Sequence, residues 1–302
     1  MDTFQGYSNT LGFFIGNENI ALKESSIAAP YLKAAARDMK AYRESKSYRS
    51  IPIGYSAADI KELRPMLQDY LTCGGNSSEI IDFFGLNSYS WCGQSDYNLS
   101  TYDQLELQAQ KFPVPIFFTE TGCIVPPGRL WDDQDAIFGD AMVNDWSGAI
   151  VYEWIQEENG YGIITYDGEQ GADGIARSGT PSPNNPDFEN LKAKWASLTP
   201  KGIKKSDYDP NSVSTRVCPS STAGGWWEVN GNVQLPTVGE TFTGPFSTVA
   251  SATADPSDNA NSEASSTASA DADGDSAASA DRQITVAAVV ASSLVLGAAL
   301  LL

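Results

Sequence analysis

The sequence predicts an α/β fold in which a parallel sheet is covered by helices. Short, continuous apolar runs alternate with segments of helical composition over the first part of the chain. Continuous apolar strands are typical of parallel sheets, because helices bury both of their faces. Large hydrophobic residues are sparse in the last part of the chain. We therefore expect one α/β domain followed by a tail.

Five strands and four helices are expected from these patterns. The strands are Leu11–Ile15, Ile51–Tyr55, Ile80–Tyr89, Val114–Thr119 and Gly148–Trp154, each a short apolar run. The helices are Pro30–Ser45, Ser56–Leu71, Ser100–Lys111 and Asp132–Asp145, and the first starts at a proline suited to a first turn. Periodicity alone allows either an open doubly wound sheet or the last five strands of a (β/α)8 barrel.

Polar residues at the carboxyl ends of the strands favour the barrel. They are Asn17 and Glu18, Tyr55, Asn87 and Tyr89, Glu120, and Tyr152 and Glu153. Barrel enzymes build their active sites at these ends. No glycine-rich phosphate loop follows any strand, which argues against a nucleotide-binding sheet.

The charge and composition exclude several classes of function. The formal net charge is −19 and the chain has no histidine. Nucleic-acid binding needs clustered Lys and Arg, so it is not expected. The lack of histidine removes Ser-His-Asp and Cys-His catalysis and most zinc sites. We expect no metal and no cofactor, and chemistry based on carboxylates, tyrosines, amides or lysines.

Two carboxylates are the candidate catalytic residues. Glu18 closes the strand FFIGNE, and Glu120 closes PIFFTE. A lone carboxylate at such a position could be structural, held by an Arg or Lys. Two at equivalent strand ends favour catalysis at a glycosidic bond, which needs one protonated and one ionised carboxyl group.

Five motifs together resemble one enzyme family. GFFIGNE, GYSAAD, DFFGLNSYSWCG, PIFFTETGC and GAIVYEW resemble the glucanosyltransferases of glycoside hydrolase family 72. These fungal cell-wall enzymes cleave β-1,3-glucan and transfer the new reducing end to another chain. The resemblance covers roughly residues 2–218 and implies a (β/α)8 TIM-barrel glycosidase of the retaining type. It makes glucan donor and acceptor chains the expected partners. A plain endo-β-1,3-glucanase and an inactive glucan-binding fragment are the alternatives.

The resemblance also assigns roles to individual residues. Glu18 corresponds to the acid/base, and Glu120 to the nucleophile. Asn17 would hydrogen-bond the 2-hydroxyl of the sugar, Tyr89 would orient the nucleophile, and Tyr152 would line the cleft.

Several further residues have two interpretations. Trp91 would either stack on a sugar or pack beside a disulfide. Asp59 is a helix cap or a sugar contact, the cap being favoured. Asp82 is expected to hold a structural partner, and Glu157 and Glu158 to be solvated.

Four cysteines occur, Cys73, Cys92, Cys123 and Cys218, and they allow three pairings. An even count and a secretory-type C-terminus favour two disulfides over four buried thiols. The family resemblance implies the pairs Cys92–Cys123 and Cys73–Cys218. Sequons at Asn76 and Asn98 predict N-glycosylation.

The C-terminal part of the chain indicates a surface protein. We expect a catalytic domain over residues 1–220, a linker over 221–246, and a disordered Ser/Ala/Asp-rich stalk over 247–283. The apolar segment 284–302 follows small residues and a polar spacer, which predicts a GPI-attachment signal with attachment near Gly274. A tail-anchored helix is the alternative. The protein would then lie on the outer leaflet of the plasma membrane, or in the cell wall.

The N-terminus does not look like a signal peptide, although GPI attachment requires entry into the secretory pathway. In the family barrel, Leu11–Ile15 corresponds to the fourth strand, so the chain would contain only strands four to eight. We therefore expect this sequence to be an N-terminally truncated form.

Overall fold

The computed structural model describes residues 1–209, 211–213 and 216–239. The predicted stalk, the apolar segment and the attachment site at Gly274 lie outside the described residues. All described residues fall within one compact unit. None of the helices in this part of the chain has the length and hydropathy needed to span a bilayer.

A parallel sheet of five strands forms the centre of the fold, and its strands are adjacent in chain order. The strands are β1 (Phe13–Asn17), β2 (Ile53–Ala58), β3 (Phe83–Asn87), β4 (Ile116–Thr121) and β5 (Trp146–Val151). The five predicted strands are therefore confirmed. Most begin two or three residues later than predicted, because each apolar run starts before its backbone pairs with a neighbour.

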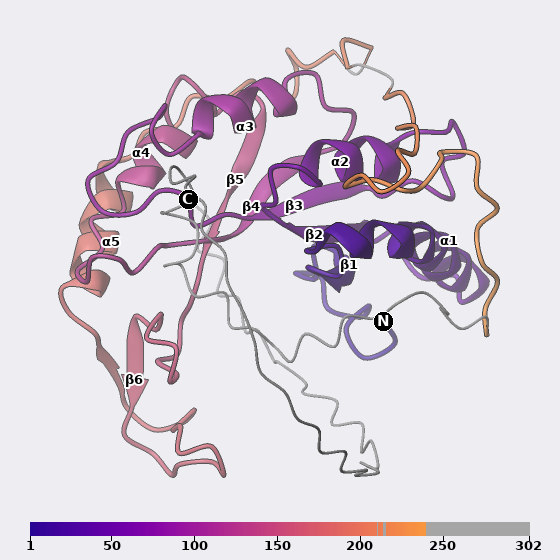
Figure 1. The fold of residues 1–302 in the computed structure, drawn as a ribbon. Helices are drawn as coiled ribbons and strands as arrows, with labels where there is room; N and C mark the ends of the chain where they lie inside the picture. Colours follow the sequence, from indigo (N-terminus) through magenta and orange to yellow (C-terminus); the bar gives the residue numbers. More distant parts are fainter. Residues whose placement is uncertain (210, 214–215, 240–302) are drawn as a thin grey trace, which may run out of the picture. The chain divides into compact units, whose positions relative to one another are not determined.

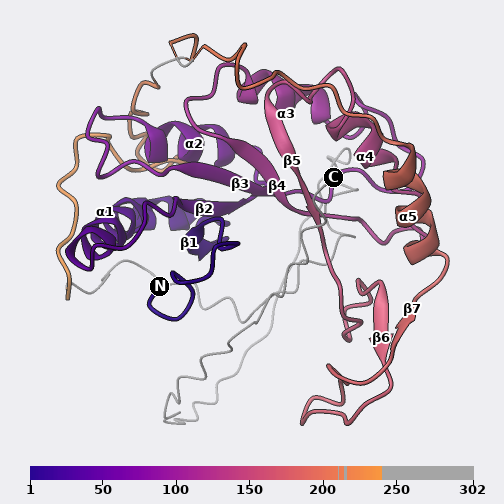
Figure 2. The same cartoon turned by 180° about the vertical axis from the view of Figure 1, so that it is seen from behind.

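Helices follow the first four strands and lie along one face of the sheet (Figures 1 and 2). They are α1 (Ala29–Ser45), preceded by the 3-10 turn η1 (Lys23–Ala28), α2 (Arg64–Thr72), α3 (Tyr102–Ala109) and α4 (Asp132–Ile137). Two predicted helices are too long. The predicted start at Ser56 is wrong because Ser56–Ala58 continues β2, and the predicted end at Asp145 is wrong because turns follow Ile137.

The main hydrophobic core lies between the sheet and these helices. Phe118 on β4 stacks on Trp146 of β5 and on Tyr102 of α3, with ring centroids 4.2 and 5.2 Å apart. Tyr55 on β2 is fully buried in this core. Tyr55 is thus a core residue, although its position near a strand end made it a candidate for the site.

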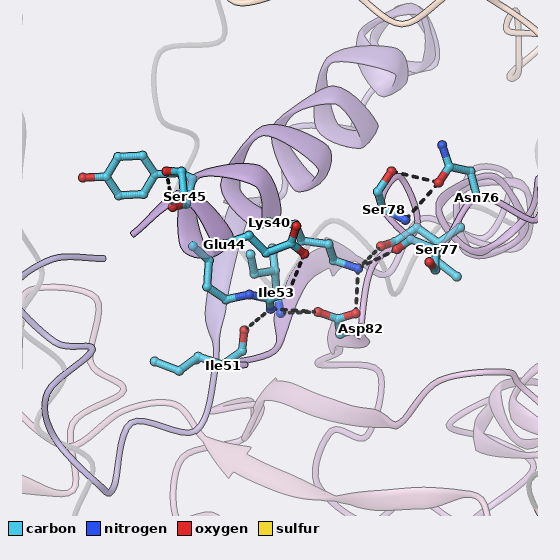
Figure 3. Close-up of polar contacts among 12 residues, drawn as sticks. Lys40, Glu44, Ser45, Ile51, Ile53, Asn76, Ser77, Ser78 and Asp82 are labelled. Carbon is cyan, nitrogen blue, oxygen red and sulfur yellow. Dashed lines mark hydrogen bonds and ion pairs between the residues drawn. The ribbon is translucent and has the colours of Figure 1, made fainter. Parts of the chain in front are cut away.

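Asp82 lies just before β3 and is a structural carboxylate, as expected. Its Oδ1 accepts a hydrogen bond of 2.6 Å from Lys40 Nζ on α1, and its Oδ2 accepts one of 2.9 Å from the backbone N of Ile53 (Figure 3). The same ammonium group donates to the carbonyl oxygens of Ser77 and Ile80. This buried cluster ties α1 to the start of β2 and β3.

The packed part of the chain extends beyond the predicted boundary at residue 220. Trp227, within the predicted linker, is only 2% exposed and packs on Tyr70 of α2 at 5.4 Å. Its indole Nε1 donates to the carbonyl oxygen of Val229. Cys73, which caps α2, is bonded to Cys218. The indole and the disulfide hold this segment against the helical layer, so its described part is not a free linker.

Two elements after β5 were not predicted. A two-stranded antiparallel sheet joins β6 (Ile164–Tyr166) and β7 (Pro181–Pro183), and helix α5 (Asp187–Ser197) follows. The chain continues from the carboxyl end of β5 towards β6 (Figure 1). These elements therefore extend the end of the sheet at which the candidate site lies.

Candidate active site

Glu18 is held in place by its backbone as well as by its side chain. It directly follows β1 and has a φ of 53°, a left-handed conformation that is uncommon for a residue with a side chain. Its backbone N donates to the carbonyl oxygen of Ser56 on β2 at 2.9 Å. Such conformations occur where the surrounding structure fixes them, and often at functional sites.

Asn87, the last residue of β3, links four strands at the centre of the site. Its Nδ2 donates to Asn17 Oδ1 at 3.0 Å and to Glu18 Oε1 at 2.9 Å. Its Oδ1 accepts hydrogen bonds from the hydroxyls of Ser56 and Thr119, at 2.8 and 2.7 Å. The side chain is 3% exposed. A buried amide with both ends in use has a fixed orientation, so it fixes Glu18 as well.

Glu120 lies on β4, and Tyr89 from the loop after β3 binds it. Tyr89 Oη donates to Glu120 Oε2 at 2.7 Å. The pKa of Glu120 is raised to about 7, chiefly by burial; the charges of Glu18 and Glu153 also raise it, and the hydrogen bonds from Tyr89 and Asn87 partly oppose the rise. Glu18 and Glu120 therefore share Asn87 as a neighbour and interact electrostatically.

No cation in the described part of the chain neutralises either carboxylate. Within the described residues, no Lys or Arg forms an ion pair with Glu18 or Glu120. The structural explanation, in which each glutamate is held by its own basic partner, is thus not what the fold contains. The two carboxyl groups are held by neutral donors, which leaves their charges available for chemistry.

Three tyrosines form an aromatic wall beside Glu120. The Tyr161 ring packs edge-on against both Tyr89 and Tyr152 at 5.4 Å, and the Tyr89 and Tyr152 rings are 6.4 Å apart. Burial and neighbouring carboxylates raise the pKa values of Tyr89 and Tyr152, so both phenols stay protonated. Asn159 donates to Glu153 Oε1 at 2.8 Å and to Tyr152 Oη at 3.3 Å.

Arg129 binds backbone carbonyl oxygens of two of these tyrosines. Its guanidinium pairs with Asp187 at the start of α5 and donates to the carbonyl oxygens of Gly122, Tyr152 and Tyr161. Its side chain is 2% exposed and lies over the Trp131 ring. One buried cation therefore connects the loop after Glu120 to the end of β5 and to Tyr161.

The cysteine pairs are those that the family resemblance implies. Cys92 is bonded to Cys123, which joins the loops after Tyr89 and Glu120, and Cys73 is bonded to Cys218. Trp91, beside the first of these bonds, packs against Tyr102 at 5.2 Å and contributes to the core. The packing interpretation of Trp91 is therefore the one that the structure supports.

The remaining candidates lie outside the carboxylate pair. Asp59 forms an ion pair with Arg64 and accepts a hydrogen bond from Ser88, so it is structural. Glu158 is exposed, whereas Glu157 pairs with Arg177 at 2.9 Å. Both sequon asparagines, Asn76 and Asn98, are exposed.

Sequence analysis missed the residues that hold the site together. Asn87 was singled out only as a strand end, and Arg129, Asn159 and Tyr161 were not singled out at all. The signal for Asn87 was present, because an amide that ends a buried apolar strand must find partners. Nothing local in the sequence indicates the contacts of Arg129, whose acceptors include Tyr152, Tyr161 and Asp187, which are 23 to 58 positions away.

A parallel sheet with helices on one face, and with two carboxyl groups and tyrosines at its carboxyl ends, has the layout of a (β/α)-barrel enzyme. Comparison with known proteins agrees. The family model for glucanosyltransferases, glycoside hydrolase family 72, matches residues 1–199, and the chain belongs to this family.

Individual relatives and solved structures support the same assignment. The chain is 39% identical over 231 residues to the 1,3-beta-glucanosyltransferase gas2 of Schizosaccharomyces pombe, covering 75% of this chain and 48% of that protein. It is 35% identical over 240 residues to 1,3-beta-glucanosyltransferase GAS2 of Saccharomyces cerevisiae, covering 78% of this chain and 40% of that protein. A solved structure of Saccharomyces cerevisiae Gas2p, a glutamate-to-glutamine mutant with laminaritetraose and laminaripentaose, matches with a TM-score of 0.66 and 34% identity.

That structure covers 77% of this chain, and this chain covers 48% of it. The five strands are thus βα units of a (β/α)8 barrel, which confirms the predicted fold class. The chain spans about half the length of the curated relatives that it matches.

Proposed function

We propose that this protein is a retaining β-1,3-glucanosyltransferase that cleaves β-1,3-glucan and transfers the new reducing end to another glucan chain. The observation that carries the proposal is the pair Glu18 and Glu120, which are fixed by Asn87 and Tyr89 without a neutralising cation. The relatives that carry the name 1,3-beta-glucanosyltransferase support the substrate class. The Gas2p structure with laminari-oligosaccharides supports it too.

In the first step, a carboxylate oxygen of Glu120 attacks the anomeric carbon of the donor. The bond to the leaving oxygen breaks, and Glu18 gives its proton to that oxygen. The product is a glycosyl ester on Glu120 and an ionised Glu18. Asn17, which is exposed next to Glu18, would hydrogen-bond the 2-hydroxyl of the reacting sugar, and Tyr152 would line the cleft.

In the second step, Glu18 takes the proton from a hydroxyl group of the acceptor glucan. The acceptor oxygen attacks the anomeric carbon and releases Glu120 as a carboxylate. Water in place of the acceptor would give hydrolysis. Tyr89 favours the reactive state of Glu120, because its hydrogen bond opposes the effect of burial on the pKa of that carboxyl group.

We also propose that the protein acts at the cell surface, attached through a GPI anchor near Gly274. Disulfide formation in the described part of the chain and two exposed sequons are compatible with secretion. Release of the protein from cells by a phosphatidylinositol-specific phospholipase C tests the anchor. Protein that stays on the membrane after this treatment would contradict it.

The activity is tested by incubating the full chain with laminariheptaose and measuring the lengths of the products. Products longer than the donor indicate transfer, and products that are only shorter indicate an endo-β-1,3-glucanase. Glu120→Gln should abolish both, whereas Glu189→Gln, an exposed glutamate on α5, should leave turnover unchanged. Binding without turnover in the parent chain would support the inactive glucan-binding alternative. Full activity of the Glu120→Gln variant would exclude the mechanism.

A further inference from the structure

Trp154 is an exposed tryptophan immediately beyond the aromatic wall. It lies two residues after Tyr152, so the two Cα atoms are at most about 7 Å apart. The Trp154 side chain is 51% exposed, and it belongs to neither of the hydrophobic clusters in the described residues. An exposed aromatic side chain close to the three tyrosines beside Glu120 suggests a binding surface rather than a packing role.

The indole is exposed but not free to move. Trp154 Nε1 donates to Tyr166 Oη on β6 at 3.0 Å, and the carbonyl oxygen of Trp154 accepts a hydrogen bond from the backbone N of Ile164 at 2.8 Å. Tyr166 itself packs against the buried cluster that contains Ile164. The Trp154 side chain is therefore ordered before any ligand binds, which reduces the loss of conformational entropy on binding.

Proximity to the proposed catalytic pair indicates what would bind there. A glucan chain is longer than the two rings at the cleaved bond, so its outer rings need contacts beyond the catalytic pair, and Trp154 lies two residues after Tyr152. A glucose ring is uncharged and has an apolar C–H face that fits the face of an indole. The carboxyl group of Glu153, in the same segment, has no basic partner among the ion pairs of the described residues and disfavours an anionic ligand.

We propose that Trp154, held by Tyr166, forms an outer subsite on which a glucose ring of bound β-1,3-glucan stacks. This inference rests on the proposed function, because it extends the same cleft. The subsite would contribute affinity to long chains only, since a short oligosaccharide that fills the positions around Glu120 does not reach it. It would therefore set the preferred chain length.

The experiment measures binding of laminaribiose and laminariheptaose by calorimetry, in full-length protein carrying Glu120→Gln so that no turnover occurs. Adding Trp154→Ala should weaken heptaose binding about two- to tenfold, the range for one aromatic contact, and leave laminaribiose binding unchanged. Trp154→Phe should restore most of the loss. Trp195→Ala is the matched control: Trp195 on α5 is 47% exposed and its Nε1 donates to Gln134, yet no change is expected.

Three outcomes would overturn the subsite. If Trp154→Ala binds heptaose as its parent does, the subsite is wrong while transfer by the wild-type chain still stands. If both oligosaccharides lose affinity equally, the effect is general rather than a lost stacking contact. If the parent binds neither oligosaccharide and the wild type shows no turnover, the proposed function fails together with the subsite.

Discussion

Replacing Glu120 by glutamine should make the protein more stable at alkaline pH. Burial raises the pKa of this carboxyl group from its ordinary 4.5 to about 7. The folded state therefore binds the proton more tightly than the unfolded state does, and the stability of the wild type falls as pH rises from about 4.5 to about 7. Glutamine carries no charge and still offers an oxygen to the Tyr89 hydroxyl. The stability of the variant therefore does not fall with pH for this reason.

The magnitude follows from the pKa values. At 1.36 kcal/mol per pH unit, the change from 4.5 to about 7 corresponds to about 3.4 kcal/mol. Glu120 is only partly buried, so solvent in the cleft screens its charge and reduces the effect to about 1–2 kcal/mol. The expected gain is close to zero at pH 4.5 and reaches its full size above pH 7.

Urea unfolding of both proteins at pH 4.5, 6 and 8.5 measures this difference. Glu189→Gln, at an exposed position on α5, serves as the control and should show no pH-dependent change in the free energy of unfolding. The reasoning would be refuted by a gain for Glu120→Gln that is the same at all three pH values. It would equally be refuted if the wild type were the more stable protein at pH 8.5.

Three further variants test other parts of the structure. Tyr89→Phe removes the donor that lowers the pKa of Glu120, so the acidic limb of the pH profile of kcat/KM should move to higher pH; an unmoved limb would contradict this. Asn87→Ala should lower kcat on the order of a hundredfold, because it removes the hydrogen bond that positions the proposed acid/base Glu18. It should also lower the free energy of unfolding by about 1–3 kcal/mol. Turnover close to wild type would show that the amide is dispensable. Trp227→Ala should lower the free energy of unfolding in urea by about 3–5 kcal/mol. The neighbouring Trp226 is 39% exposed, so Trp226→Ala should change this free energy by less than about 0.5 kcal/mol. Equal effects of the two substitutions would contradict the burial of Trp227 against α2.

The sheet was predictable because its central strands are apolar, and β2 and β3 are buried along their whole length. Runs such as DFFGLN and PIFFT have no polar alternation, and only a helix-covered parallel sheet accommodates several of them in succession. Boundaries were less predictable. Ser56–Ala58 has a composition compatible with either state, and pairing with β3 decides in favour of the strand.

The elements after β5 were not predictable from local pattern. β7 is Pro-Ser-Pro, a composition that propensity assigns to a turn, and it becomes a strand only by pairing with β6. Along α5 only Phe188, Leu191 and Trp195 are large apolar residues at helical spacing, and only Leu191 is buried, which is a weak local signal for a helix. Trp227 falls in the segment predicted as a linker, and its burial depends on Tyr70, which is more than 150 positions earlier.

For the site, sequence patterns located the strand ends, and long-range contacts completed the arrangement. Glu18 and Glu120 follow from their positions after apolar strands. The way Asn87 joins Asn17, Ser56 and Thr119 depends on strand order and register, which the sequence does not display.

The bond between Cys73 and Cys218 encloses most of the sheet in a covalent ring. The two cysteines are 145 positions apart in the sequence, and β3, β4 and β5 lie between them. A protease that cuts the exposed segment 169–174 opens this ring at one point only. The two pieces remain tethered until a reducing agent breaks this bond, and both glutamates lie on the N-terminal piece.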